Sequence, residues 1–270
     1  MPDTKIACII PVKDRRTLVM EAIESALHQD RYPPTEIVVV DDGSKDGTPD
    51  LIKEKFPQVR VIRAFGLGPG PARNLGARKT KADVLMFLDS DDIWTPSHVE
   101  TLLLPIIKGS HCSFGITIND GKCLERPFAI PGDEFDANLA MHENLFRWCS
   151  IVPSSFAIRR EAFIESGGFP RLPLGEDWLF FASLSLKYQF SYAPVVVTKR
   201  RIHKGNLCWQ GFSAELALRL IEHLKNVAKD NGLHNELDHL RKVSDLILSE
   251  GKKWKSVQEW YNSLKEHALL

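Results

Sequence analysis

The sequence lacks an excess of charge of either sign. Its 270 residues contain 35 lysines and arginines and 35 aspartates and glutamates, so the formal net charge is zero. A broad basic surface for nucleic acid or anionic lipid is therefore not expected, and only a local charged patch is compatible with this balance. Hydrophobic residues make up 43% and charged residues 26% of the chain, which is typical of a folded globular protein.

Closely spaced cysteine pairs are also absent. The chain has five cysteines, an odd number, and no C-x-x-C motif: Cys8, Cys112, Cys123, Cys149 and Cys208. A disulfide framework and a zinc ribbon both require paired, close spacings, so neither is expected. A reducing compartment is the simplest setting for such a chain.

Long hydrophobic runs are missing as well. The apolar patches are short, such as Val84–Leu88, and none approaches the roughly 18–20 residues that span a bilayer. No signal peptide is expected at residues 1–5, because no long apolar core follows them. We expect a cytoplasmic protein that is soluble, or peripheral at the inner face of the membrane.

The first hundred residues alternate between short apolar strands and amphipathic helices. Strands are predicted at residues 5–10, 36–40, 59–64 and 84–88, and helices at 17–29, 50–56 and 71–79. This alternation predicts an α/β fold with a mostly parallel sheet that helices cover. Ligands bind such sheets at the carboxyl ends of the strands, where this sequence places its acidic clusters.

The rest of the chain divides into an irregular middle and a helical tail. Residues 119–122, Asn-Asp-Gly-Lys, predict a hairpin turn, and a strand at 154–158 and a helix at 176–187 are expected. From about residue 211, apolar residues such as Leu220 and Leu224 recur every three or four positions, which indicates helices. We predict one domain over residues 1–210 and a C-terminal helical extension over 211–270.

The strongest chemical motif is Asp89-Ser90-Asp91. In an extended segment, residues two apart point to the same side, so both carboxylates can face one ligand. Mg²⁺ and Mn²⁺ prefer such oxygen ligands, usually one or two carboxylates together with substrate phosphates. The structural alternative is a capped loop before a helix that starts at Thr95-Pro96.

Two other motifs suggest sites that the details reject. Within the segment from Asp41 to Thr48, a pattern that starts at Asp42 resembles a calcium-binding EF-hand loop, but its twelfth position is Lys53 and a strand precedes it. A turn rich in N-capping residues explains it equally well. The glycine-rich residues 66–71 do not spell G-x-G-x-x-G, and the chain has no G-K-[ST] phosphate loop.

Six motifs, in order along residues 5–208, together resemble the signature of family 2 glycosyltransferases with the GT-A fold. They are Ile9-Ile10-Pro11-Val12, Val38-Val39-Val40-Asp41-Asp42-Gly43-Ser44, Ala72-Arg73-Asn74, Phe87-Leu88-Asp89-Ser90-Asp91-Asp92, Gly167-Gly168-Phe169 with Gly175-Glu176-Asp177-Trp178, and Arg201-Ile202-His203 with Asn206. The resemblance implies a GT-A type, Rossmann-like mixed sheet with helices on both faces. It also implies inverting transfer of a hexosyl-type sugar from a nucleoside diphosphate to an acceptor hydroxyl, with Mn²⁺ or Mg²⁺ as cofactor.

The resemblance assigns roles to single residues. Asp177 is implied to be the general base and Asp91 to hold the metal, and His203 is implied to assist either the metal or the phosphates. The donor-side residues that it implies are Pro11, Lys13, Asp14, Asp41, Asp42, Arg73, Asp89 and Glu176. Of these, Asp41 or Asp42 is implied to contact the nucleobase, and the sequence does not show which one.

Partners follow from the same resemblance. The donor is a UDP-, GDP- or dTDP-linked sugar, the acceptor is a glycan, a lipid-linked sugar or a small molecule, and no nucleic acid is expected. The resemblance also implies a role in cell-envelope polysaccharide synthesis. The C-terminal helices are candidates for a peripheral membrane contact or a homodimer contact.

Some positions depart from the family pattern, and they leave donor and acceptor open. Lys13-Asp14 stands where many members carry an aromatic residue and Asn, Leu179 where an acidic residue is common, Ser183 near a frequent Arg, and Cys208 where a small hydroxyl residue is usual. Structural alternatives also exist for two site residues. Asp177 is compatible with a helix N-terminal carboxylate, and His203 with a buried core histidine.

Two readings compete with glycosyl transfer. A haloacid dehalogenase-type phosphatase would use Asp89 as nucleophile and Asp91 as acid, but its motif normally follows the first strand and here three strands precede it. A non-catalytic relative would bind nucleotide or glycan without turnover.

Overall fold

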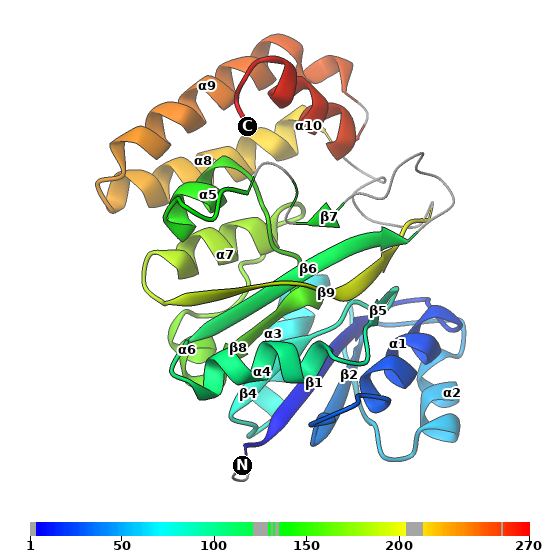
Figure 1. Cartoon of the computed structure of the whole chain (residues 1–270). Coiled ribbons are helices and arrows are strands. Elements are labelled where there is room, and N and C mark those ends of the chain that lie inside the picture. Colours follow the sequence, from blue (N-terminus) through cyan, green and yellow to red (C-terminus); the bar gives the residue numbers. More distant parts are fainter. Residues whose placement is uncertain (1–3, 121–128, 131, 133–134, 204–212, 255) are drawn as a thin grey trace. The chain divides into compact units, whose positions relative to one another are not determined.

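The structure is a computed structural model, and it describes residues 4–120, 129–130, 132, 135–203, 213–254 and 256–270 (Figure 1). The chain forms two compact units whose segments alternate along the sequence. The sheet unit takes its residues from 1–131, 151–171 and 188–201, and the helical unit from 132–150, 172–187 and 202–270. The division into domains at residue 210 stays a prediction.

The sheet unit holds the strands and the helices that cover them. Its strands are β1 (Ile6–Val12), β2 (Glu36–Asp41), β3 (Arg60–Arg63), β4 (Val84–Phe87), β5 (Asp92–Trp94), β6 (Cys112–Asp120), β7 (Ala129–Ile130), β8 (Phe156–Arg159) and β9 (Phe190–Arg201). Its helices are α1 (Leu18–Leu27), α2 (Thr48–Lys55), α3 (Pro69–Lys79), α4 (His98–Ile107), the 3-10 turn η1 (Pro153–Ser155) and α6 (Arg160–Glu165).

The strands form one mixed sheet in the order β3-β2-β1-β4-β8-β6-β9-β5, with β7 paired to β6. Strands β3, β2, β1 and β4 are parallel neighbours, and β6 is parallel to β9. Strands β8, β5 and β7 pair antiparallel to their neighbours. The predicted α/β fold with a mixed, mostly parallel sheet is confirmed.

Strand β1 is buried on both faces, as its unbroken apolar sequence predicted. Its residues Cys8 and Ile10 belong to a core with apolar residues of α1 and α4, such as Ile23 and Leu102. On the other face a side chain at Gly76 of α3 would lie only 2.5 Å from Ile9, so the missing side chain lets α3 approach the sheet closely.

The second half of the sheet differs most from the sequence prediction. The long strands β6 and β9 fall in the region taken as irregular, and they pair with each other over most of their length. The strand expected at 154–158 begins at Phe156, after the η1 turn, and α3 begins at Pro69 rather than Pro71. Of the predicted hairpin turn, Asn119 and Asp120 end β6, while Gly121 and Lys122 lie outside the described residues.

The helical unit contains α5 (Met141–Arg147), α7 (Glu176–Ser185), α8 (Ala214–Asp230), α9 (His234–Glu250), η3 (Gly251–Lys253) and α10 (Val257–Glu266). The predicted C-terminal helices are therefore present. Aromatic side chains join α10 to the other helices: Trp260 lies 5.9 Å from Trp178 of α7 and 5.6 Å from Trp148, measured between ring centroids.

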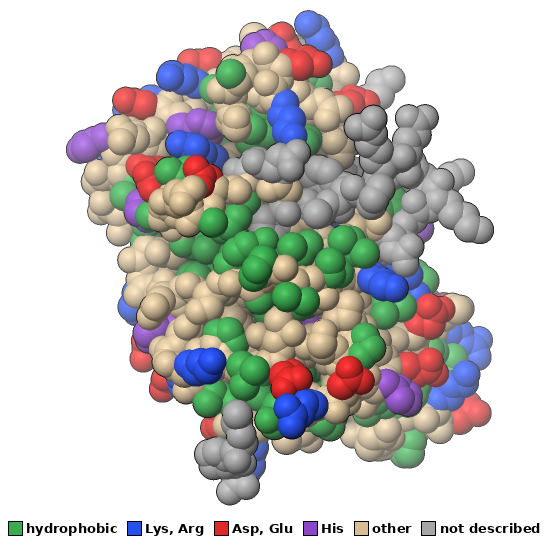
Figure 2. Space-filling view, viewed as in Figure 1, with side chains coloured by type: hydrophobic (Ala, Val, Ile, Leu, Met, Phe, Trp, Pro, Cys, Tyr) green, Lys and Arg blue, Asp and Glu red, His purple; other side chains and the backbone are tan. Residues whose placement is uncertain are grey.

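The surface agrees with the balanced composition. Basic and acidic side chains are interspersed over the described part of the face that Figure 2 shows. Within the described residues, no helix is both long enough and apolar enough to cross a membrane.

One buried histidine joins α4 to the sheet. The His98 side chain is fully buried, stacks on Trp94 at 3.9 Å, and its Nδ1 lies 3.0 Å from the carbonyl oxygen of Val197 in β9. Burial lowers the pKa of His98 to about 3, although the bond to Val197 opposes the shift. The imidazole is therefore neutral in the folded protein, because a charged form would lose its hydration.

We expect His98 to make the fold acid-sensitive. The unfolded chain binds a proton at this imidazole below about pH 6.5, whereas the folded chain does not until about pH 3. The free energy of unfolding should thus fall as the pH drops through this range, by up to about 1.4 kcal/mol per unit for one proton. Denaturant unfolding between pH 7.5 and 4 should show a shallower decline in His98→Gln. The exposed His28→Gln control should keep the wild-type decline, and equal slopes in all three proteins would contradict this account.

Candidate active site at the carboxyl ends of the strands

The parallel strands bring the predicted donor-side residues to one edge of the sheet. Strand β1 ends at Val12, and β2 ends at its register partner Asp41. Asp89 follows β4, whose Phe87 pairs with Ile9 of β1. Because these strands are parallel neighbours, the loops after them emerge on the same side, as the sequence predicted.

The loops after β1 and β2 are tied together by backbone-to-side-chain bonds. The Asp14 amide donates to the Ser44 hydroxyl at 2.8 Å, and the Lys45 amide donates to the Asp14 carboxylate at 2.7 Å. Asp14 adopts φ 51°, a conformation uncommon for a residue other than glycine. The Asp14 carboxylate therefore holds the loop, the Lys13 side chain is exposed, and Pro11 is buried within β1.

Asp41 and Asp42 differ sharply in their partners. Asp42 accepts backbone N–H bonds from Leu67 at 2.8 Å and Gly68 at 3.0 Å, one on each oxygen. Asp41 is fully buried, and its Oδ2 pairs with the Arg63 guanidinium at 2.9 Å. Its Oδ1 is buried and has no hydrogen-bond partner among the described residues. An unmet buried acceptor costs about 1–3 kcal/mol, so this oxygen is the one suited to a ligand donor.

The turn after β4 concentrates three carboxylates. Asp92 is 3% exposed, and burial, followed by the charges of Asp89 and Asp91, raises its pKa to about 8. The charge of Arg200 and a hydrogen bond from Ser154 oppose this shift. The Ser154 hydroxyl donates to Asp92 Oδ2 at 2.6 Å and accepts the Asp89 amide at 3.0 Å. One buried hydroxyl thus holds both ends of the turn.

Arginines lie against the other two carboxylates. The buried Arg73 of α3 donates to Asp89 Oδ1 at 2.5 Å, and Arg15 lies 3.4 Å from Asp91 Oδ2. Arg201 of β9 donates through Nε to the Asp91 carbonyl at 2.6 Å. The site therefore combines acidic groups with cations that can also meet a phosphate.

Arg73 is placed by the Gly167-Gly168-Phe169 motif. Its guanidinium lies 5.2 Å from the Phe169 ring centroid. The neighbouring Asn74 holds Phe169 by two bonds, one from its amide to the Phe169 carbonyl and one from the Phe169 N–H to its oxygen. Gly168 has φ +75°, and a side chain there would lie 2.4 Å from the Asn74 oxygen, so only glycine fits.

The predicted general base, Asp177, lies in the helical unit, at the start of α7. Glu176 and Asp177 are half-buried, and the Asp177 carboxylate accepts the Trp178 N–H at 2.8 Å. Gly175 caps the helix with φ +73°, and a side chain there would lie 2.3 Å from Leu220 of α8. The Trp178 indole donates to the Leu145 carbonyl of α5 at 2.5 Å. The helical tail therefore packs against the segment that carries Asp177.

The metal prediction rests on few carboxylates. Among the described residues no group of three or more His, Cys, Asp or Glu side chains is arranged to hold a metal ion. Mg²⁺ and Mn²⁺ usually take only one or two protein carboxylates with substrate phosphates, and Asp89 and Asp91 supply such oxygens. His203 lies in the helical unit after β9 and is half-buried, and its metal role stays a prediction.

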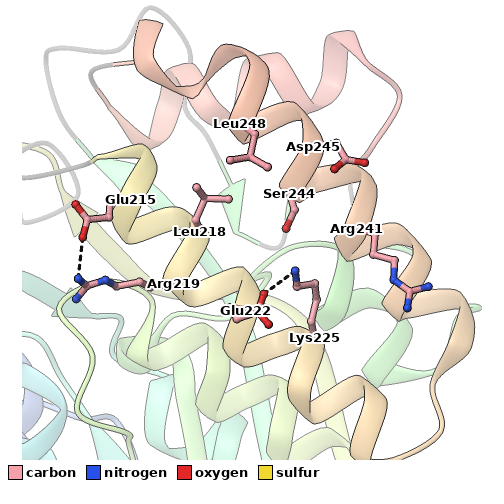
Figure 3. A pocket seen from close by; sticks show the side chains of 9 residues that line it. All are labelled: Glu215, Leu218, Arg219, Glu222, Lys225, Arg241, Ser244, Asp245 and Leu248. Carbon is pink, nitrogen blue, oxygen red and sulfur yellow. Dashed lines mark hydrogen bonds and ion pairs between the residues drawn. The ribbon is translucent and has the colours of Figure 1, made fainter.

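A cavity of about 470 Å³ lies elsewhere, between α8 and α9 (Figure 3). Four of its charged side chains are paired locally, Arg219 with Glu215 and Lys225 with Glu222. The predicted site residues do not line it.

The structure adds three residues that the sequence motifs did not single out. Ser154 has no motif of its own, Arg15 follows the departure at Lys13-Asp14, and Arg63 simply ends an edge strand. Only their long-range partners identify them: Ser154 is 62 residues from Asp92, and Arg15 is 76 residues (91 − 15) from Asp91.

Comparison with known proteins bears on the same residues. The sequence profile of Glycosyl transferase family 2 matches residues 7–167, which include most of β1 and all of β2, α3, the acidic turn and Ser154. The chain belongs to glycosyl transferase family 2. An uncharacterized glycosyltransferase of Rickettsia bellii is 29% identical over 211 residues, which are 76% of this chain and 30% of that protein.

Other relatives agree with this family. The UDP-Glc:alpha-D-GlcNAc-diphosphoundecaprenol beta-1,3-glucosyltransferase WfaP of Escherichia coli is 26% identical over 231 residues, 84% of this chain and 87% of that one. The chain spans about a third of the length of three Rickettsia relatives that it matches.

Solved structures share the fold of this family 2 chain. The S. aureus TarS 1–349 complex with UDP matches with a TM-score of 0.65 and 19% identity, over 93% of this chain and 72% of that chain. The mannosyltransferase PcManGT from Pyrobaculum calidifontis, in complex with GDP-Man and Mn²⁺, matches with a TM-score of 0.61 and 19% identity, over 98% and 80%. The GT-A type fold implied by the sequence motifs is confirmed.

We expect Ser154→Ala to destabilise the protein by about 2–3 kcal/mol, because the substitution leaves the Asp89 amide and the Asp92 carboxyl without their shared partner. Ser155→Ala is a matched control, since Ser155 is also fully buried but its hydroxyl makes one local bond, to the Val152 carbonyl. It should cost about 1 kcal/mol. Denaturant unfolding of both variants measures the difference, and equal losses would show that Ser154 does not hold the turn.

Proposed function

We propose that this chain transfers a sugar from a nucleoside diphosphate to an acceptor hydroxyl with inversion at the anomeric carbon. The observation that supports this most is the edge formed by β2 and β4. There a buried carboxylate oxygen of Asp41 lacks a partner in the described part of the chain, and an acidic turn bordered by arginines lies within the family-matched segment. The Asp41 oxygen suits the nucleobase of a nucleoside diphosphate, and the acidic turn with its arginines suits the diphosphate.

The nucleobase of the donor is proposed to bind at Asp41 rather than Asp42. Both oxygens of Asp42 already accept backbone N–H bonds of the glycine-rich loop. Asp41 Oδ1 is available to accept a ring N–H of a base. This oxygen is covered in the present conformation, so binding requires a neighbouring side chain to move, and Arg63, whose side chain is 42% exposed, is one such neighbour.

The diphosphate is proposed to bind at the acidic turn together with Mn²⁺ or Mg²⁺. Asp91 would hold the metal, Asp89 would contact the ribose or the donor sugar, and His203 is the further candidate ligand. When bound, the ion would neutralise charge that develops on the departing nucleoside diphosphate. Arg73 and Arg15 already lie against these carboxylates and are positioned to meet phosphate oxygens.

Asp177 is proposed as the general base. It would take the proton of the acceptor hydroxyl as that oxygen bonds to the anomeric carbon and the bond to the diphosphate breaks, so a single displacement inverts the carbon. Its half-buried position at the start of α7 is compatible with contact to an acceptor. Glu176 is proposed to contact the donor.

Donor and acceptor classes are proposals drawn from the relatives. Fold neighbours were solved with UDP, UDP-GlcNAc or GDP-Man, and the WfaP name specifies a UDP-glucose donor and a lipid-linked acceptor. We therefore propose a UDP- or GDP-linked hexose, with dTDP as the third candidate nucleotide, and a glycan or lipid-linked acceptor at the cell envelope.

The phosphatase alternative receives no support from the site. Its motif would place Asp89 as a nucleophile after the first strand, whereas here Asp89 follows β4 and is paired with Arg73. The family match covers this turn as part of a glycosyltransferase.

Substitution of the proposed base tests the reaction. We expect Asp177→Asn to lower the transfer rate by about 10²–10⁴-fold, because the acceptor proton loses its positioned base. Binding of nucleoside diphosphate with Mn²⁺, measured by calorimetry, should stay close to wild type. This pattern would also separate an enzyme from a relative that only binds nucleotide.

Asp50→Asn is the matched control, since Asp50 is an exposed carboxylate in the first turn of α2, as Asp177 is in the first turn of α7. It should leave transfer unchanged. Full transfer activity in Asp177→Asn would show that Asp177 is only a helix-terminal carboxylate.

A further inference from the structure

Phe65 is an exposed aromatic residue next to Asp41, at the proposed nucleobase site. Its side chain is 75% exposed, and it lies two residues after Arg63, the last residue of β3. Single exposed apolar side chains are common on protein surfaces and carry no function by themselves. The neighbours of Phe65 distinguish it.

Those neighbours belong to the proposed nucleobase site. A side chain at Gly43 would lie 3.1 Å from the Phe65 ring, so the ring is close to the backbone of the Asp41-Asp42-Gly43-Ser44 motif. The Arg63 guanidinium lies 5.8 Å from the ring centroid and bonds Asp41 Oδ2 at 2.9 Å. The ring, the guanidinium and the buried carboxylate thus form one continuous group.

The backbone around Phe65 is held on both sides. Before it, the Ala64 amide donates to the Asp41 carbonyl at 2.8 Å. After it, the amides of Leu67 and Gly68 donate to the Asp42 carboxylate. A ring presented by such a fixed backbone loses little freedom when a planar ligand covers it.

A nucleobase matches this group in shape and chemistry. Its face can stack on an exposed aromatic ring, and its edge carries N–H groups that can donate to a carboxylate oxygen. Residues 13–16, which follow β1, are Lys-Asp-Arg-Arg and offer no aromatic ring of their own.

We propose that Phe65 is the stacking platform for the nucleobase of the donor, and that with Asp41 it sets the preference for the base. This inference rests on the proposed function. Stacking tolerates any base, because every base has an aromatic face. Selection then comes from Asp41, whose buried acceptor favours bases with a ring N–H, such as uracil, thymine and guanine, over cytosine and adenine.

Calorimetry with UDP, GDP and inorganic pyrophosphate, each with Mg²⁺, tests this role, since pyrophosphate has no base. We expect Phe65→Leu to weaken binding of the preferred nucleoside diphosphate by about 5- to 100-fold and to leave pyrophosphate binding unchanged. Phe65→Tyr, which keeps the ring, should bind within about threefold of wild type. Leu248→Ala, at a side chain that is 67% exposed, is the control and should change neither ligand.

The outcomes separate the two proposals. Wild-type affinity for nucleoside diphosphates in Phe65→Leu would overturn the stacking role and leave glycosyl transfer intact. An equal loss for pyrophosphate would also overturn it, because the defect would then not involve the base. A wild-type chain that binds none of the nucleotides would overturn the proposed function, and the stacking role with it.

Discussion

Carboxyl groups are concentrated in one short turn after β4, and the rest of the site depends on how the fold holds them. Three carboxylates occur within residues 89–92, and one of them, Asp92, is buried with its pKa raised to about 8. The compensation comes from distant parts of the chain: Arg73 from α3, Arg15 from the loop after β1, and Ser154 from η1. A charge-neutral composition therefore contains a strongly polarised site.

The same network orders the neighbouring segments. Arg73 joins the acidic turn to the Phe169 ring, and Asn74 fixes that ring through its backbone. On the other side, Asp42 fixes the glycine-rich loop that follows Phe65. Sites of this kind need little rearrangement of their dipoles when a charged ligand binds, which is a main source of catalytic power in enzymes.

The sequence predicted the first half of the fold well because its signals are local. Unbroken apolar strands, helix periodicity and acidic residues at strand ends located β1 to β4 and the edge where the site lies. The strands β6 and β9 were missed, because their pairing joins residues about eighty positions apart. The domain boundary at residue 210 was placed where the helical repeat begins, and it stays a prediction.

Within the site, the sequence motifs identified the carboxylates but did not show which of them holds a loop and which is available to a ligand. Asp41 and Asp42 are adjacent and chemically identical, and only the loop amides bonded to Asp42 distinguish them. Ser154 and Phe65 carry no local signal, since a buried serine and an exposed phenylalanine acquire meaning only from their three-dimensional neighbours. A structure identifies such residues, whereas a sequence pattern does not.

The most direct test of the account is whether the acidic turn binds a nucleoside diphosphate through a divalent cation. The measurement is the melting temperature of the wild type and of Asp91→Asn with UDP, GDP or dTDP, each with and without Mn²⁺. A ligand of the folded state stabilises it by about 2.7 kcal/mol at a hundredfold excess over its dissociation constant. The account predicts an Mn²⁺-dependent rise with at least one nucleotide in the wild type and its loss in Asp91→Asn. No rise with any nucleotide, or the same rise in Asp91→Asn, would contradict it.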